Sequence, residues 1–211
     1  MKKKTSPDSK AKRHKIITID PSGTGTTGIY LLDKETNEEI FQEYKSSKWE
    51  EHLQFLVEKI KDWKPNIILY ENTYYVHKRI TGTLSLLKLI GGIVGMKYTF
   101  DSIEELNSIA VNQVKSFKDK LFTNKEQIEK LTCKIGRGKG WKYKNKKINL
   151  HQLDALVIYH LWSKKSLEST KSIKKKINEL KTKKRLGTKQ KEKLEQLQKI
   201  LHDRELSNTS I

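Results

Sequence analysis

Residues 16–32 read IITIDPSGTGTTGIYLL and contain two apolar runs joined by a small polar loop. The first run is β-rich and ends at Asp20, and a proline, a serine and three glycines follow it, which is typical of a tight turn between strands. A further β-rich run occupies 39–44, after a polar turn at 33–38. These residues predict a three-stranded antiparallel meander whose first strand ends in a carboxylate.

The segments beyond the meander alternate between helix and strand patterns. Residues 47–63 have apolar side chains at helical spacing, with Ser47 as the expected N-cap. Residues 66–71 form an unalternating apolar run, as expected of an inner strand covered on both faces. We therefore expect an α/β fold in which a mixed sheet is flanked by helices. The other expected elements are a buried helix at 81–96 that is apolar nearly all round, a strand at 107–111, helices at 113–122, 125–134 and 150–162, and a glycine-rich basic loop at 136–147.

Composition divides the chain into three parts. Residues 1–14 are polar and Lys-rich without apolar patterning, so we expect a disordered basic arm. Residues 15–164 contain the strand and helix patterns and are expected to form one compact domain. Residues 165–211 carry two narrow apolar stripes separated at 186–188, which predicts a basic helical hairpin as a C-terminal extension.

The positive charge is concentrated in three segments. The formal net charge is +19, and 39 of the 44 basic residues are lysine. Residues 1–15 carry seven basic residues and one acid, residues 134–147 seven and none, and residues 165–211 fourteen and six, which leaves sixteen bases and eighteen acids elsewhere. A lysine bias acting everywhere would not leave the core slightly acidic. Local basic patches that bind nucleic acid are therefore favoured over a uniformly solvated lysine surface.

The single cysteine, Cys133, supports neither a disulfide framework nor a cysteine-rich zinc site. We therefore expect a reducing compartment, namely the cytoplasm. The longest apolar run, at 84–96, has thirteen residues and contains Lys88. Neither a signal peptide nor a membrane span is expected from such a run.

Carboxylates end two of the expected strands, and a third carboxylate lies on the last core helix. Asp20 ends the first strand, and Glu71 ends the inner strand, where an acid is costly without a cation or hydrogen bonds. His151 and Asp154 share one face of the helix. Each residue also has a local structural explanation. Asp20 could start a turn and Glu71 could be an exposed strand end, while His151 could cap the helix and Asp154 could interact with the helix dipole. Their positions in a mixed α/β sheet favour one shared site for a hard divalent cation.

The acid pattern and its order along the chain resemble the RuvC family of Holliday junction resolvases, within the ribonuclease H-like superfamily. The resemblance covers residues 15–164 and rests on Asp20 with Pro21, Ser22 and Gly28, on Glu71, and on His151, Asp154 and Ala155. It implies a ribonuclease H-like mixed five-stranded sheet flanked by helices. Lesser features of the same resemblance are Tyr74 after Glu71, a small residue at Gly91 or Gly92, and basic positions at Val114-Lys115 and Lys125.

The resemblance implies a homodimeric, Mg²⁺-dependent endonuclease that resolves four-way (Holliday) DNA junctions by paired nicks, in DNA recombination and repair. Asp20, Glu71, His151 and Asp154 would be its catalytic residues and would hold two Mg²⁺ ions, or Mn²⁺, per active site. The glycine-rich loop after Asp20, the basic insertion at 134–147 and the C-terminal hairpin depart from the minimal family core.

Basic and aromatic residues near the acids supply the expected DNA contacts. Lysine and arginine neutralise phosphates, and aromatic side chains stack on unpaired bases at a branch point. The residues assigned to DNA binding are Tyr74, Lys115, Lys125, Arg137, Lys139, Trp141, Lys142, Tyr143 and Lys144.

Three other functions fit parts of the sequence. The loop at 20–28 also looks like the first phosphate loop of actin-like ATPases and sugar kinases, but we expect 211 residues to leave no room for their duplicated second lobe. A non-catalytic architectural DNA binder would explain the charge but not the acids. A ribonuclease H-like nuclease acting on other branched DNA or on RNA–DNA hybrids is the third alternative.

Overall fold

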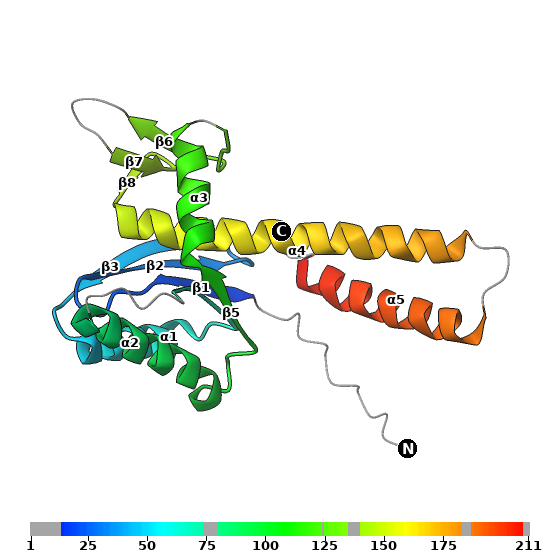
Figure 1. The fold of residues 1–211 in the computed structure, drawn as a ribbon, viewed down its shortest axis with the longest axis horizontal. Helices are drawn as coiled ribbons and strands as arrows, with labels where there is room; N and C mark the ends of the chain where they lie inside the picture. The colour runs from blue at the N-terminus through cyan, green and yellow to red at the C-terminus, as the bar shows by residue number, and fades with distance from the viewer. Residues whose placement is uncertain (1–13, 74–79, 124, 135–139, 183–186, 209–211) are drawn as a thin grey trace, which may run out of the picture.

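The computed structural model describes residues 14–73, 80–123, 125–134, 140–182 and 187–208. Apart from His14, the predicted disordered arm therefore lies outside the described residues. The core is a mixed five-stranded sheet with helices on both faces (Figure 1). This arrangement confirms the predicted α/β fold class.

The central sheet has the strand order β3-β2-β1-β4-β5. Its strands are β1 (Lys15–Asp20), β2 (Thr26–Asp33), β3 (Glu38–Lys45), β4 (Ile67–Asn72) and β5 (Glu105–Ala110). β1, β2 and β3 pair as the predicted antiparallel meander, whereas β1, β4 and β5 run parallel. Ile19 pairs with Tyr70 across β1 and β4. The next residues of these strands, Asp20 and Glu71, therefore lie side by side at one edge of the sheet.

Two helical layers bury the two faces of the sheet (Figure 1). The helices are α1 (Trp49–Trp63), α2 (Ile80–Thr99), α3 (Val111–Phe122) and α4 (Leu150–Lys181). α1 and α2 pack on one face, where Leu56 and Leu89 are fully buried. α3 and α4 pack on the other face, where Phe117 and Leu153 join a second core. Both faces of β1 and β4 are thus covered, which explains why these strands are largely apolar before Asp20 and Glu71.

α4 is one continuous helix of 32 residues that projects well beyond the sheet (Figure 1). A capping box begins it: the Asn149 side chain accepts a hydrogen bond from the Gln152 amide at 2.8 Å, and the Gln152 side chain accepts one from the Asn149 amide at 3.0 Å. The expected domain boundary at 164–165 falls inside α4, which has no break there. α5 (Thr188–Asn208) folds back along the end of α4 and completes the hairpin. Within the described residues, no helix is long and apolar enough to span a membrane.

A small antiparallel sheet, which we call the insert sheet, lies between α3 and α4 in the chain. It consists of β6 (Leu131–Lys134), β7 (Gly140–Tyr143) and β8 (Lys146–Ile148). The predicted helix at 125–134 is wrong, and so is the predicted loop from residue 140 onward. Lys144 and Asn145 both have positive φ, at 46° and 67°, and form a two-residue turn between β7 and β8. Because that turn contains no glycine, its sequence does not look like a hairpin.

α2 is buried on one side only, which corrects the prediction of a helix buried all round. Leu89, Ile93 and Met96 face the core. The opposite side carries an apolar strip, the α2 stripe, which is exposed because α2 lies in the outer layer beside α1 (Figure 1). The stripe consists of Leu84, Leu87, Gly91, Val94, Gly95 and Tyr98.

Candidate metal centre

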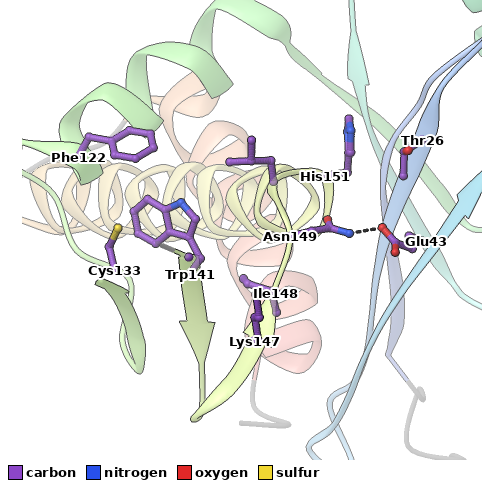
Figure 2. A pocket seen from close by; sticks show the side chains of 11 residues that line it. Thr26, Glu43, Phe122, Cys133, Trp141, Lys147, Ile148, Asn149 and His151 are labelled. Carbon is purple, nitrogen blue, oxygen red and sulfur yellow. Dashed lines mark hydrogen bonds between the residues drawn. The ribbon is translucent and has the colours of Figure 1, made fainter. Parts of the chain in front are cut away.

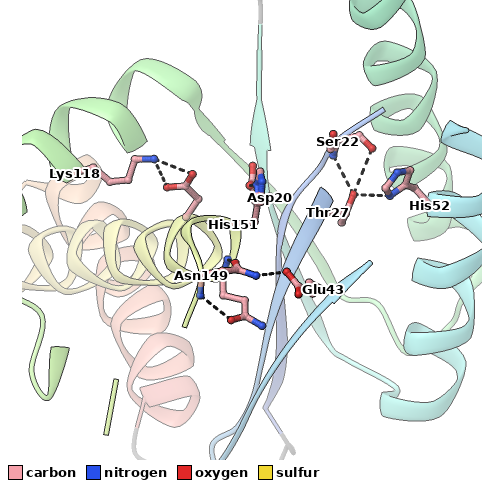
Figure 3. Close-up of polar contacts among 10 residues, drawn as sticks. Asp20, Ser22, Thr27, Glu43, His52, Lys118, Asn149 and His151 are labelled. Atoms are coloured by element: carbon pink, nitrogen blue, oxygen red, sulfur yellow. Dashed lines mark hydrogen bonds and ion pairs between the residues drawn. The ribbon is translucent and has the colours of Figure 1, made fainter. Parts of the chain in front are cut away.

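Asp20 and His151 meet because α4 begins directly against β2. Gly28 pairs with Asp20 across β1 and β2. A Cβ at Gly28 would overlap the main-chain carbonyl of His151, so only glycine allows the helix to approach this closely. Nδ1 of His151 lies 2.8 Å from Oδ2 of Asp20 (Figure 3). The predicted pair of first-strand acid and last-helix histidine is therefore in direct contact.

The loop after Asp20 is held by buried hydrogen bonds to α1 (Figure 3). Thr27 Oγ1 accepts a hydrogen bond from the Ser22 amide at 3.0 Å and lies 2.9 Å from Nδ1 of His52, which is fully buried. Nε2 of His52 lies 3.1 Å from the main-chain oxygen of Ser46. This network holds the turn beside the acid in one conformation.

Glu71 lies beside Asp20 on the parallel neighbour strand, as the strand register requires. A cavity of about 180 Å³ lies between β1, β4 and α2, and both carboxylates line it. Burial, followed by the negative charges of Asp20 and Asp154, raises the pKa of Glu71 to about 8. Two carboxylates held this close repel each other when both are ionised, unless a cation lies between them.

Asp154 comes one helical turn after His151 and faces α3. Nζ of Lys118 lies 2.6 Å from Oδ1 of Asp154 and donates a hydrogen bond to Oδ2 at 2.8 Å (Figure 3). The Asp154 side chain is 14% exposed and that of Lys118 is 21% exposed, so this ion pair is shielded from water. Within the described part of the chain, no donor makes a well-directed hydrogen bond to Oδ1.

The three carboxylates and the imidazole form one electrostatic unit. Burial raises the pKa of Asp20, against the opposing hydrogen bond with His151, and burial also raises the pKa of Asp154, against the opposing effect of Lys118. The hydrogen bond with Asp20 is the main reason why the pKa of His151 is raised. For both Asp20 and Asp154, burial therefore outweighs the stabilisation that the basic partner gives to the charged carboxylate.

The donor set fits a hard divalent cation. Carboxylate oxygens with one imidazole suit Mg²⁺ or Mn²⁺, and a bound cation would stabilise the charged forms of these buried acids. In this conformation Asp154 turns to Lys118 and Asp20 to His151. Accordingly, no three His, Cys, Asp or Glu side chains among the described residues are already arranged as metal ligands.

Two of the predicted DNA-binding residues lie exposed on or just after α3. Lys115 is exposed, and its charge acts on Glu71, which places it near the acids. Lys125 is also exposed, beyond the end of α3. The predicted contacts Tyr74, Arg137 and Lys139 lie outside the described residues.

Three of the predicted DNA contacts lie in the insert sheet and have partners within the protein. Trp141 is only 6% exposed and packs edge-on against Phe122, so little of its ring is open to a base. The Tyr143 hydroxyl donates to Glu39 at 3.2 Å, and Nζ of Lys144 lies 2.7 Å from the same carboxylate. These side chains tie the insert sheet to β3. Lys142 is half-buried on β7.

The sequence interpretation missed Lys118 and the pair formed by Asn149 and Glu43. Lys118 follows Lys115 by three residues, so the two share one side of α3, but lysine is too common in this chain for the spacing to stand out. Asn149 and Gln152 have the spacing of a capping box at the start of α4, where the predicted helix at 150–162 also begins. Glu43 accepts a hydrogen bond from the Asn149 amide group, and no local sequence pattern indicates it.

No protein-family model and no curated protein sequence matches the chain. Solved structures similar to it include RuvC of T. thermophilus in complex with a Holliday junction substrate, with a TM-score of 0.47, 13% identity, and coverage of 69% of this chain and 89% of that one. T. thermophilus RuvC in another structure has a TM-score of 0.44, 14% identity and coverage of 68% and 90%. The yeast mitochondrial Holliday junction resolvase has a TM-score of 0.38, 14% identity and coverage of 53% and 56%. The likeness is one of fold.

Proposed function

We propose that the chain is a metal-dependent, structure-specific endodeoxyribonuclease that resolves four-way DNA junctions by paired nicks. The observation that carries this proposal is the meeting of Asp20, Glu71 and Asp154, with His151, at one edge of the sheet. Burial raises the pKa of all three acids even though Asp20 and Asp154 have basic partners, and the negative charge of Asp20 raises the pKa of Glu71 and Asp154 as well. A centre of this kind is suited to binding cations that act on a phosphate.

Asp20, Glu71, His151 and Asp154 would hold two Mg²⁺ or Mn²⁺ ions. When bound, such ions activate water and offset negative charge on a phosphodiester undergoing displacement. The hydrogen bond from His151 fixes the orientation of the Asp20 carboxylate, and Lys118 does the same for Asp154. Lys115, exposed on α3 near Glu71, would contact the phosphate backbone.

The charge distribution supports a nucleic-acid substrate. The acidic centre lies within a core of slightly negative charge, and basic segments flank it in the sequence. Lysine-rich surfaces neutralise phosphates and give binding that weakens as salt is added. The choice of a four-way junction over other branched DNA or RNA–DNA hybrids rests on the sequence resemblance.

The α2 stripe supports the proposed homodimer. Leu84, Leu87, Val94 and Tyr98 are exposed at 50%, 39%, 36% and 87%. Together with Gly91 they follow the alternating three- and four-residue spacing of a helix–helix seam. Gly91 and Gly95 leave open space on the same side, which allows a second helix to approach closely. Paired nicks need two centres, and a second copy packed on α2 would supply the other one.

Replacing Leu87 with glutamate should disrupt this dimer. A charge buried in an apolar seam would weaken self-association by about a hundredfold. Sedimentation velocity over a concentration series would measure this, with Lys97→Glu, exposed on the same helix outside the stripe, as the matched control. A wild-type chain that stays monomeric at high micromolar concentration would contradict the dimer.

The function is tested by incubating the protein with matched linear, forked and four-way DNA in Mg²⁺ or in EDTA. We expect nicks in the four-way DNA in Mg²⁺ only. Equal cutting of forks or of RNA–DNA hybrids would select the alternative nuclease substrates. Binding of DNA without cleavage in Mg²⁺ or Mn²⁺ would overturn the proposed activity.

A further inference from the structure

A large pocket opens between the insert sheet, the start of α4 and the edge of β2 and β3 (Figure 2). Its volume is about 770 Å³, within the range of sites that bind small molecules, about 300–1,000 Å³. Figure 2 shows Phe122, Cys133 and Trp141 at one end and Thr26 with Glu43 at the other. The pocket is therefore apolar at the end formed by the insert sheet and polar at the end formed by the central sheet.

The apolar end leaves large side chains in contact with water. Phe122 is 51% exposed and Leu150 is 56% exposed, and both line the pocket. Burying such side chains against a flat ring is favourable because it removes apolar surface from water. The pocket thus has free apolar surface that a planar ligand could cover.

The polar end carries groups of the type that recognise base edges. Asn149 donates a hydrogen bond to Glu43 across this end of the pocket (Figure 2). Amide and carboxylate groups pair with the donors and acceptors of nucleobases. Lys147, exposed on β8, lines the pocket and supplies a positive charge for a phosphate.

The pocket shares His151 with the candidate metal centre. This side chain lines the pocket and also contacts Asp20 through Nδ1. A phosphodiester bound at the acids would therefore have its neighbouring nucleotide beside the pocket. An apolar segment of a partner protein would not need to lie next to the metal centre.

We propose that this pocket binds one unpaired nucleobase of the nucleic-acid substrate, adjacent to the phosphate held at the acids. The base would cover Phe122 and Leu150 and direct its polar edge toward Asn149 and Glu43. The inference rests on the proposed function, because it assumes a nucleic-acid substrate at the acidic centre. It adds a reason for preferring branched or distorted DNA, in which a base is free to leave the stack.

Gly140 offers a way to fill the pocket without disturbing the fold. It lines the pocket, and a Cβ there would lie 3.6 Å from Cε of Lys147, an ordinary contact with a flexible side chain. Gly140→Leu should therefore occupy the space of the base. Thr132→Leu is the matched control, because Thr132 is exposed on the neighbouring strand β6 and does not line this pocket.

The probe is four-way DNA carrying 2-aminopurine at one nucleotide position at a time near the branch point. All variants carry Asp20→Asn so that the DNA stays intact. Fluorescence reports whether the base has left the stack, and anisotropy of an end label reports binding of the whole DNA. We expect one position to brighten several-fold on binding. Gly140→Leu should abolish that signal and weaken DNA binding by no more than about tenfold, the value of one stacked base. The control Thr132→Leu should leave both the fluorescence signal and DNA binding unchanged.

Two results would overturn the inference. If no position brightens while anisotropy shows binding, the pocket does not bind a base, and an apolar segment of a partner protein would be its occupant instead. If a position brightens equally in Gly140→Leu, the base unstacks elsewhere. The absence of cleavage by the wild-type chain would refute the proposed nuclease activity, but the fluorescence result would still decide on the pocket.

Discussion

The carboxyl edge of the central sheet and the insert sheet lie next to each other and are built in opposite ways. At the sheet edge, acids are partly buried and apolar strands support them. In the insert sheet, Trp141 is buried and lysines lie outside. Under the proposed function, the rigid central sheet would position the acids for chemistry, and the insert sheet would provide the surface that holds the substrate.

Removing one acid should separate chemistry from binding most clearly. Asp20→Asn and Glu71→Gln should each lower the rate of DNA cleavage by about 10³-fold, because the cation site loses a charged ligand. DNA affinity should stay within about threefold, since these acids repel phosphate. Single-turnover cleavage and fluorescence anisotropy on the same four-way DNA measure the two effects.

Glu105→Gln is the matched control for these variants. Glu105 is an exposed strand acid at the opposite edge of the sheet, where β5 begins, and its replacement should leave cleavage unchanged. Full activity in Asp20→Asn would show that the sheet edge is not where the chemistry occurs.

Neutralising exposed lysines of the insert sheet should weaken DNA binding but not slow the chemical step. Lys146 and Lys147 are exposed on β8, so replacing both with glutamine should weaken binding by about tenfold and lower the slope of log affinity against log salt by about 2. Lys144→Gln serves as the comparison, because Lys144 is already paired with Glu39 and should change the slope less. A slope that the double variant leaves unaltered would mean that β8 does not contact phosphates.

The smallest expected effect is a pH dependence of stability in the metal-free protein. Glu71 has a pKa of about 8 in the fold against 4.5 for the unperturbed side chain. Between these values the folded state binds more protons than the unfolded state, so stability should fall as pH rises from about 5 to about 8. Thermal unfolding in EDTA should show a decline of a few degrees that Glu71→Gln flattens. If the melting temperatures of the wild type and Glu71→Gln changed with pH in parallel, the raised pKa of Glu71 would be refuted.

The central sheet could be predicted from sequence because its signals are local. The apolar runs before Asp20 and Glu71 have the length and composition of strands, and the antiparallel meander follows from the short turns. The meeting of these acids with His151 could be anticipated from the order of elements. The contact itself depends on Gly28, whose role becomes apparent only when α4 lies on β2.

The insert sheet and Lys118 could not be predicted because nonlocal contacts decide them. Trp141 and Tyr143 lie among lysines in the sequence, which suggested stacking on DNA, yet Trp141 is buried against Phe122 and the half-buried Tyr143 donates a hydrogen bond to Glu39. Lys118 is one lysine among many until α3 packs beside α4 and brings it to Asp154. Ser47 does not cap α1, which begins at Trp49 after a turn in which Ser46 accepts a hydrogen bond from the Lys48 amide.

Calorimetric titration of Mn²⁺ into the DNA-free protein tests the acidic centre most directly, because it does not depend on the choice of substrate. The wild-type chain should bind Mn²⁺ with a defined stoichiometry, and Asp20→Asn and Glu71→Gln should each weaken that binding at least about tenfold, whereas Glu105→Gln should not. Equal Mn²⁺ binding by the wild-type chain and both acid variants would contradict a metal centre at this edge of the sheet.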